Sequence, residues 1–249
     1  MWTTAARWTG DTLRHASAGL ASLLYPPRCE YCAAQIGSRD YLCASCREKA
    51  RRIEPPFCQT CSAPFEGDIT QEFTCANCHD RHFHFTHAVS CFLSRGVVRE
   101  LIHRFKYGGE FHLRHPLADW LAETMHDERI ARQRMDLLVP VPLHARRIRE
   151  REFNQAEVLA RLVAARGGAP ALDCLRRVRY TTTQTRFDRV ERMENLRNAF
   201  EMRQTANVRG MHLVLVDDVL TTGSTLDECA RVLLCAGAAS VRAITVARG

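Results

Sequence analysis

Two adjacent carboxylates, Asp217 and Asp218, stand just before a short segment rich in hydroxyl groups, Thr221–Thr225. Backbone N–H groups and hydroxyls at the start of a helix favour a phosphate, and carboxylates accept hydrogen bonds from sugar hydroxyls. The apolar run Leu213–Val216 precedes the acids and predicts a strand buried on both faces. Apolar residues at helical spacing follow the loop and end at Gly237, a residue suited to the position after a helix. The order strand, loop, helix therefore predicts a site for ribose 5-phosphate, in which a phosphate and a diol lie close together.

Two other interpretations of this segment fit less well. An ordinary turn between a strand and a helix does not account for two adjacent carboxylates followed by a loop with four hydroxyls. A Walker phosphate loop needs a lysine after its last glycine, where this chain has Ser224. The segment resembles the 5-phosphoribosyl-1-pyrophosphate (PRPP) motif of type I phosphoribosyltransferases. The resemblance implies a PRPP-binding role for Asp217, Asp218, Thr221, Thr222, Gly223, Ser224 and Thr225.

Eight of the twelve cysteines lie before residue 80, in four Cys-x-x-Cys pairs. Two such pairs can complete a tetrahedral zinc shell, and a site with four thiolates has no open position and is structural. A redox role fits poorly with four pairs in so short a stretch. Pairing in chain order predicts two zinc ribbons in series, although an interleaved arrangement of the first pair with the third stays open. The predicted ligands are Cys29, Cys32, Cys43 and Cys46 in one set and Cys58, Cys61, Cys75 and Cys78 in the other.

After the cysteines the pattern changes to that of an α/β domain. Short apolar runs predict strands at 88–93, 137–139 and 241–246. Apolar residues at helical spacing predict helices over 97–105, from Pro116 onward, and from about Asn154 to the glycines at 167–168. Residues 176–198 show no clean period and are rich in arginine. Strands alternating with helices predict a mainly parallel sheet flanked by helices.

Length and composition are those of an ordinary globular chain. The 249 residues leave room for one α/β domain and a small module, and 25% charged with 46% hydrophobic residues is unexceptional. No apolar run approaches the ~18 residues of a membrane span, so we expect no membrane insertion. Residues 1–25 predict an amphipathic docking helix without a convincing cleavage site, and a cytoplasmic location is expected.

The chain as a whole resembles the ComF family of competence-related proteins, in which a zinc-ribbon head precedes a type I phosphoribosyltransferase domain. The resemblance runs from Pro26 to the C-terminus. Beside the cysteine pairs and the Asp217–Thr225 loop it rests on Phe105-Lys106-Tyr107, Val139–His144, Arg149, Arg151, Phe153-Asn154-Gln155, Thr183-Gln184, and Arg192 with Asn195. The chain departs from the family pattern in two places: Glu152 stands where glycine is usual before Phe153, and Arg186 and Phe187 stand where leucine is common after Gln184.

This resemblance implies a fold and its boundaries. We expect a docking helix at 1–25, a double zinc ribbon at 26–80 and a phosphoribosyltransferase-like domain at 81–249, with the type I phosphoribosyltransferase fold. It also implies two structural Zn²⁺ ions, and Mg²⁺ bound together with PRPP.

The resemblance further implies a division of labour for phosphoribosyl transfer, in which positive charge develops at ribose C1 while pyrophosphate leaves. Asp217 and Asp218, with the loop that follows them, bind the ribose 5-phosphate, and the two acids are also candidate catalytic residues at the reacting sugar. A second loop resembles the pyrophosphate loop of purine-pathway amidotransferases, and its candidate PRPP-binding residues are Pro142, Leu143, His144 and Arg146. Lys106 is a further candidate PRPP-binding residue. Residues 179–195 form a candidate lid that excludes water. Its Arg189 and Arg192 are the candidate catalytic charges for the leaving group, against the simpler interpretation that they lie on a solvated face.

Two functional classes fit these features. One is a PRPP-binding protein of DNA uptake and natural transformation, for which single-stranded DNA and proteins of the competence machinery are candidate partners. The other is an enzyme that transfers phosphoribose to an acceptor that no motif identifies. A third functional class, an adaptor protein that acts only through its zinc ribbons, fits less well, since it would not need Asp217 and Asp218. Oligomeric state is not predicted.

Charge distribution bears on any DNA interface. Acidic residues outnumber basic ones between residues 28 and 80, and thiolate zinc sites add further negative charge, so the positive net charge of the chain, +7, resides in the remainder. We therefore expect single-stranded DNA on the surfaces of Arg146–Arg151 and Arg176–Arg192, with Phe153, Tyr180 or Phe187 for base stacking.

Overall fold

The computed structural model describes residues 26–37, 40–65, 67, 69, 72–180 and 196–249. The chain forms two compact units, Met1–Ala50 and Arg51–Gly249. The division falls between the two cysteine sets, so the second set belongs to the same unit as the α/β domain. The predicted docking helix at residues 1–25 lies outside the described residues.

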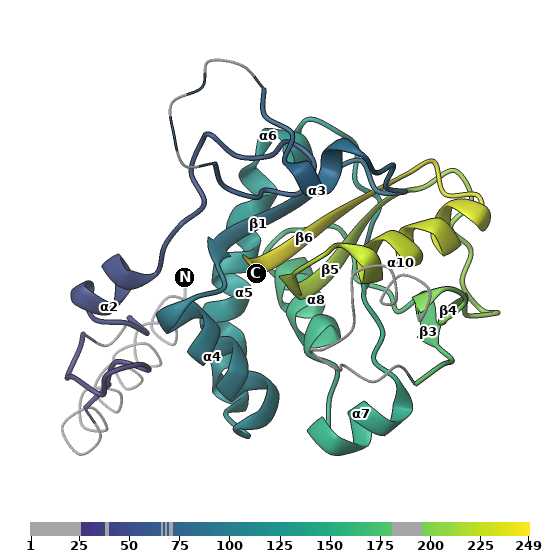
Figure 1. Ribbon diagram of the computed structural model, residues 1–249. Helices are drawn as coiled ribbons and strands as arrows, with labels where there is room; N and C mark the ends of the chain where they lie inside the picture. Colours follow the sequence, from purple (N-terminus) through teal and green to yellow (C-terminus); the bar gives the residue numbers. More distant parts are fainter. Residues whose placement is uncertain (1–25, 38–39, 66, 68, 70–71, 181–195) are drawn as a thin grey trace, which may run out of the picture. The chain divides into compact units, whose positions relative to one another are not determined.

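Four parallel strands form the sheet of the larger unit (Figure 1). Their order across the sheet is β1 (Ala88–Leu93), β6 (Ser240–Arg248), β5 (His212–Leu220) and β2 (Leu137–Pro140). The strands are apolar on both faces because helices cover both faces of a parallel sheet. The mainly parallel sheet predicted from the sequence is confirmed. Strand β5 extends beyond the acids to Leu220, because β6 is long enough to pair with it as far as Arg248.

Helices cover the two faces of this sheet (Figure 1). On one face α5 (Arg114–Glu123) packs on β1 and β6 and also against α8 (Gln155–Ala165), which packs on β5 and β2. The other face carries α10 (Ser224–Cys235), which packs on β5 and β6. Strand β1 leads into α4 (Gly96–Tyr107), and the basic stretch of the sequence forms a short helix, α7 (Ala145–Arg151). The shorter helices among the described residues are α2 (Ala44–Lys49), α3 (Ala76–His79), η1 (Phe111–Leu113), η2 (Thr124–His126) and α6 (Glu128–Ala131).

A small antiparallel hairpin lies beside α10. It pairs β3 (Leu175–Arg177) with β4 (Phe200–Met202). The chain between these strands includes residues 181–195, which lie outside the described residues. The lid predicted there, with Arg189 and Arg192, therefore stays a prediction.

One apolar core joins the α10 face of the sheet to the second cysteine set. It includes Leu215 of β5, Ala243 of β6 and Leu233 of α10, together with Cys58 and Cys61. Residues 51–80 thus share a core with the α/β domain, across the boundary that the sequence placed at residue 80. The segment 79–87, between this cysteine set and β1, contains no strand.

Candidate functional site

The loop between β5 and α10 has the backbone geometry of an anion site. Gly223 stands at the N-cap of α10 with φ 81°, a left-handed conformation that favours glycine. A Cβ atom there would also lie 3.2 Å from the Phe83 ring. The hydroxyl of Thr222 lies 3.0 Å from that of Ser224. Helix α10 is twelve residues long, and its N-terminal N–H groups and dipole favour a phosphate at this loop.

Asp217 and Asp218 lie in β5 just before this loop and point to opposite faces of the sheet, because successive strand residues alternate. Asp217 is half-buried on the face covered by α10, where burial and, after it, the charge of Asp217 raise the pKa of the Cys229 thiol. Asp218 is 3% exposed and forms an ion pair with Lys106, at the end of α4. The Asp218 N–H donates to Asp217 Oδ1 at 2.9 Å.

Burial shifts the protonation of this group of charges toward the neutral forms. The pKa of Asp217 is raised to about 6 by burial, and the positive charges of Lys106, Arg177 and Arg151 counteract only part of that effect. Burial lowers the pKa of Lys106 to about 8, although the charge of Asp217 opposes the shift. The site therefore holds both groups with pKa values close to neutrality, as is common where charged ligands bind.

The second predicted loop leaves the sheet beside the acids. The Val141 N–H donates to the Val216 carbonyl at 2.9 Å, so the chain after β2 emerges next to Asp217. Asn154 holds this loop, since its side-chain amide donates to the Val141 carbonyl at 3.1 Å while its oxygen caps α8.

Of the predicted residues in this loop, Pro142 is buried and Leu143 and His144 are half-buried. His144 caps α7, where its Nδ1 accepts from the Arg146 N–H at 3.2 Å. Arg146 itself is exposed and pairs with Glu150 at 3.2 Å. These contacts place the predicted pyrophosphate residues at the start of a short helix beside Asp217.

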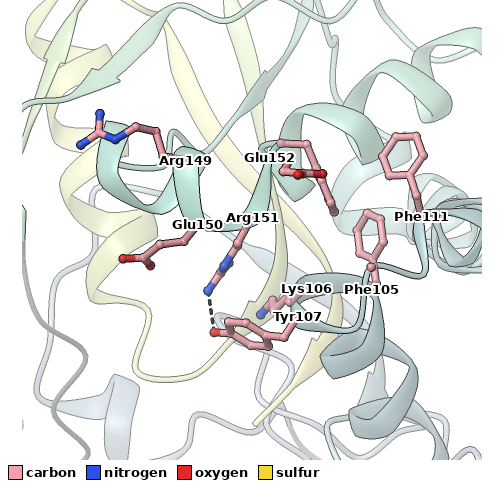
Figure 2. Close-up of a pocket in the computed structure, with 10 residues that line it drawn as sticks. Phe105, Lys106, Tyr107, Phe111, Arg149, Glu150, Arg151 and Glu152 are labelled. Atoms are coloured by element: carbon pink, nitrogen blue, oxygen red, sulfur yellow. Dashed lines mark hydrogen bonds between the residues drawn. The ribbon is translucent and has the colours of Figure 1, made fainter.

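A cavity of about 340 Å³ adjoins Lys106, between the end of α4 and the end of α7 (Figure 2). Arg151 is 9% exposed and reaches toward Tyr107, whose hydroxyl accepts from its Nη2 at 2.5 Å. The guanidinium also lies 4.5 Å from the centre of the Tyr107 ring. Phe105 and Phe111 contribute apolar walls. Glu152 lies at the cavity with φ 68°, which explains why glycine is usual at this position in the family that the sequence resembles.

Sequence reasoning did not find every residue that contacts the site. Arg177 of β3 was grouped with the basic stretch, yet its charge acts on Asp217. Arg81 and His84 contact the phosphate loop and α10, and their only sequence signal was the alternation of histidine and phenylalanine in residues 82–85.

The eight predicted zinc ligands form two groups in chain order, not interleaved. Within each group the four sulfur atoms lie within 4.8 Å of one another. The distance from Cys32 Sγ to Cys43 Sγ is 3.6 Å, as is that from Cys61 Sγ to Cys75 Sγ. A tetrahedral site with Zn–S bonds of ~2.3 Å has sulfur atoms about 3.8 Å apart. Both groups therefore fit a zinc ion.

Both zinc groups are built from the same pair of turns. After the first Cys-x-x-Cys of each group comes a residue with positive φ, Ala33 at 59° or Ser62 at 56°. The second pair of each group begins a short helix, with Cys43 at the N-cap of α2 and Cys75 at the N-cap of α3. Residues 26–37 and 40–50 thus repeat the arrangement of the second group, as expected of two ribbons in series.

No helix in the described part of the chain is long and apolar enough to cross a membrane.

Comparison with known proteins supports the two-part organisation. Residues 20–85 match the family model described as "Double zinc ribbon domain", and residues 154–249 match "Phosphoribosyl transferase domain". The two four-cysteine groups together with the first of these matches support two structural zinc ions. A solved glutamine PRPP amidotransferase from B. subtilis aligns with 52% of this chain and 25% of its own at 23% identity and a TM-score of 0.35, too distant to add to the assignment.

The relatives cover almost the whole chain. "DNA utilization protein YhgH" of Salmonella typhimurium is 32% identical over 88% of this chain and 96% of its own length. "Competence protein F" of Haemophilus influenzae is 29% identical over 89% of this chain and 96% of its own length. "Competence protein ComFC" of Bacillus subtilis is 28% identical over 83% of this chain and 84% of its own length. The chain therefore belongs to the ComF family, with a double zinc ribbon followed by a domain of the type I phosphoribosyltransferase fold.

Proposed function

We propose that this protein binds PRPP with Mg²⁺ at the Asp217–Thr225 loop and acts in DNA uptake. The observation that carries the proposal is the position of Asp217 near the end of β5, a few residues before a helix-opening loop whose Gly223 is left-handed. A ribose 5-phosphate spans these two features, since its phosphate suits the helix N-terminus and its hydroxyls suit the acid.

Both acids serve the ribose in this proposal, in different ways. Asp217 is half-buried and carries a raised pKa, so a donor from a ribose hydroxyl relieves the burial of its charge. Asp218 is already compensated by Lys106. PRPP brings a pyrophosphate that attracts the same ammonium group, so Lys106 connects the acid to the leaving-group side of the ligand.

Magnesium comes with the ligand. Mg²⁺ keeps several waters and binds through one or two carboxylates plus substrate phosphates. Asp217 offers such a carboxylate beside the loop that leaves β2. The ion supplies charge neutralisation for pyrophosphate, while the chain orients the sugar and holds the 5-phosphate.

The role in DNA uptake rests on the relatives, whose names refer to competence and to DNA utilization. Single-stranded DNA and proteins of the competence machinery are the proposed partners, and a cytoplasmic location is part of this proposal. The basic residues of α7 are the proposed contact for DNA.

A second candidate function is phosphoribosyl transfer, which the cavity beside Lys106 favours. In such a reaction the bond from ribose C1 to the pyrophosphate oxygen breaks, and an acceptor nucleophile forms the new bond at C1. The leaving pyrophosphate takes both electrons of the broken bond. The cavity holds about 340 Å³ and brings Arg151 and Tyr107 next to Lys106, so an acceptor there would lie beside the PRPP site.

Titration calorimetry with PRPP tests the binding proposal. We expect saturable binding at one site that is tighter with Mg²⁺ than with a chelator, and competition by ribose 5-phosphate. No heat and no competition at millimolar PRPP would contradict it. The second candidate is tested by pyrophosphate release against acceptors that include single-stranded DNA. Release of pyrophosphate only in the presence of one acceptor would establish phosphoribosyl transfer. Binding of PRPP without release of pyrophosphate for any acceptor would contradict transfer and support the PRPP-binding function alone.

A further inference from the structure

The second cysteine group and the phosphate loop lie in one compact unit, and Arg81 and Arg248 connect them. Residues Arg81–Phe85, which we call the strap, follow Cys78 and lie against the start of α10. We propose that the second zinc site positions the phosphate loop through the strap and Arg248, so that zinc at this site sets the affinity for a 5-phosphate. The inference rests on the proposed function of the loop and extends it to the cysteines of the second group, which lie outside the loop.

Arg81 orients the loop backbone. Its Nη1 donates to the Thr222 carbonyl oxygen at 3.2 Å, and its guanidinium lies 4.4 Å from the centre of the Phe83 ring. In a planar trans peptide the carbonyl and the following N–H point in opposite directions. The contact therefore turns the Gly223 N–H away from the strap, toward the side on which a phosphate would bind. Arg81 is three residues after Cys78, and its own N–H contacts the Cys78 carbonyl at 3.4 Å.

Two aromatic rings of the strap pack against the loop at Gly223. Phe83 and Phe85 stack with 4.7 Å between ring centres, and Phe85 is almost fully buried. They lie so close to Gly223 that a Cβ atom there would be 3.2 and 3.5 Å from them. The left-handed turn of the loop thus rests on side chains of the strap, and a displacement of the strap would move it.

His84 ties the strap to the first turn of α10. Its backbone N–H donates to Asp227 Oδ1 at 2.6 Å, and its ring Nδ1 lies 2.9 Å from the same oxygen. An acid in the first turn stabilises the helix but repels an incoming phosphate. The two contacts with His84 hold the Asp227 carboxylate on the side of the strap, away from an incoming phosphate.

Arg248 forms a second connection at the other end of the loop. Its Nη2 lies 3.9 Å from Cys61 Sγ, a predicted zinc ligand. Its Nη1 donates to the Leu220 carbonyl at 3.3 Å, and the Gly249 N–H donates to the same oxygen at 2.8 Å. By the same peptide geometry this fixes the direction of the Thr221 N–H. Both the beginning and the middle of the loop are therefore held by residues that contact or directly follow the second cysteine group.

The first cysteine group provides a matched control, because it belongs to the other compact unit. We compare Cys75→Ser with Cys32→Ser, measuring bound zinc and the calorimetric affinity for ribose 5-phosphate. Each variant should lose one zinc. Cys75→Ser should bind ribose 5-phosphate at least about tenfold more weakly, as expected when more than one supporting hydrogen bond is lost. Cys32→Ser should bind it as wild type does.

Because Cys75→Ser could unfold the larger unit, the strap is tested separately. Arg81→Met should keep two zinc ions and the wild-type melting temperature, but bind ribose 5-phosphate about three- to tenfold more weakly. Arg81→Lys, which restores a donor, should recover part of the affinity. Pyrophosphate with Mg²⁺ should bind both variants equally, since the strap contacts described above are with Thr222, Gly223 and Asp227, on the 5-phosphate side of the site.

The outcomes separate the two proposals. If wild type binds ribose 5-phosphate and Arg81→Met binds it equally well, the strap does not position the loop and this inference is wrong. Equal weakening by Cys32→Ser and Cys75→Ser would also overturn it. If wild type does not bind ribose 5-phosphate at all, the proposed function fails and this inference fails with it.

Discussion

Lys106, at the C-terminal end of α4, forms an ion pair with Asp218 of β5, a residue that is 3% exposed. This contact joins two segments more than a hundred residues apart in the sequence. It compensates a buried carboxylate directly before the phosphate loop, and it places an ammonium group between the acids and the cavity.

Lys106→Met should destabilise the protein. Without its partner Asp218 keeps a buried charge, and breaking a buried ion pair by removing one partner costs about 3–5 kcal/mol. Chemical denaturation at pH 7.5 measures the loss. Lys49→Met is the control, because Lys49 is the only other lysine of the chain and is exposed. A Lys106→Met variant as stable as Lys49→Met would show that the ion pair is not a structural element.

The affinity for PRPP should depend on pH through Asp217. Its pKa is raised to about 6, so the carboxylate that accepts from ribose is lost as pH falls below that value. Lys106, with its pKa lowered to about 8, loses its charge above that value. Affinity should therefore be highest between about pH 6 and pH 8.

PRPP also titrates, so the pH series is measured on wild type and on Asp217→Asn. The ratio of the two affinities removes the contribution of the ligand. It should shrink as pH falls from 7 to 5. A ratio that does not change over this interval would mean that Asp217 is not the titrating acceptor.

Metal analysis of protein purified without chelators should give two zinc ions per chain. The two groups of four sulfurs have the spacing of tetrahedral sites, and such sites contribute to folding. Because the first group lies outside the larger unit, Cys32→Ser should leave the thermal unfolding of residues 51–249 nearly unchanged. One zinc or none in the wild-type protein would refute the double site.

Single-stranded DNA binding should depend strongly on salt and reside on α7. Each lost phosphate contact lowers the slope of log affinity against log salt by about 0.7 for single strands. Changing Arg146, Arg147 and Arg149 to alanine should thus reduce the slope by about 2, and PRPP should compete with DNA. Arg132→Ala, an exposed arginine paired with Glu128 on α6, should have no effect. An unchanged slope of log affinity against log salt in the triple variant would show that the DNA-binding surface is not on α7.

The elements that position the site could be predicted because their signals are local. The apolar run before Asp217, the glycine at 223 and the Cys-x-x-Cys spacing each determine nearby backbone geometry, and the strand, the turn and both cysteine groups were found in this way. Asn154 was likewise placed at the start of α8, which it caps.

What could not be predicted depends on contacts between distant parts of the chain. Nothing local indicates that Arg81 donates to the Thr222 carbonyl, or that Lys106 forms an ion pair with Asp218. Nor does any local signal indicate that Cys58 and Cys61 share an apolar core with the sheet and α10. The sequence predicts DNA contacts for Arg146–Arg151, but Arg151 is buried and donates to the Tyr107 hydroxyl.

The central claim is that Asp217 and Asp218 hold PRPP, Asp217 at a ribose hydroxyl and Asp218 through its ion pair with Lys106. Calorimetry of the Asp217→Asn/Asp218→Asn double variant with Mg²⁺ and PRPP tests this claim most directly. Hydrogen bonds to charged groups contribute about 1.5–3 kcal/mol each. Either single variant should therefore bind about ten- to a hundredfold more weakly, and the double variant at least about a hundredfold more weakly, than wild type. Unchanged zinc content and circular dichroism would show that the double variant is folded. Wild-type affinity for PRPP in that folded double variant would contradict the account.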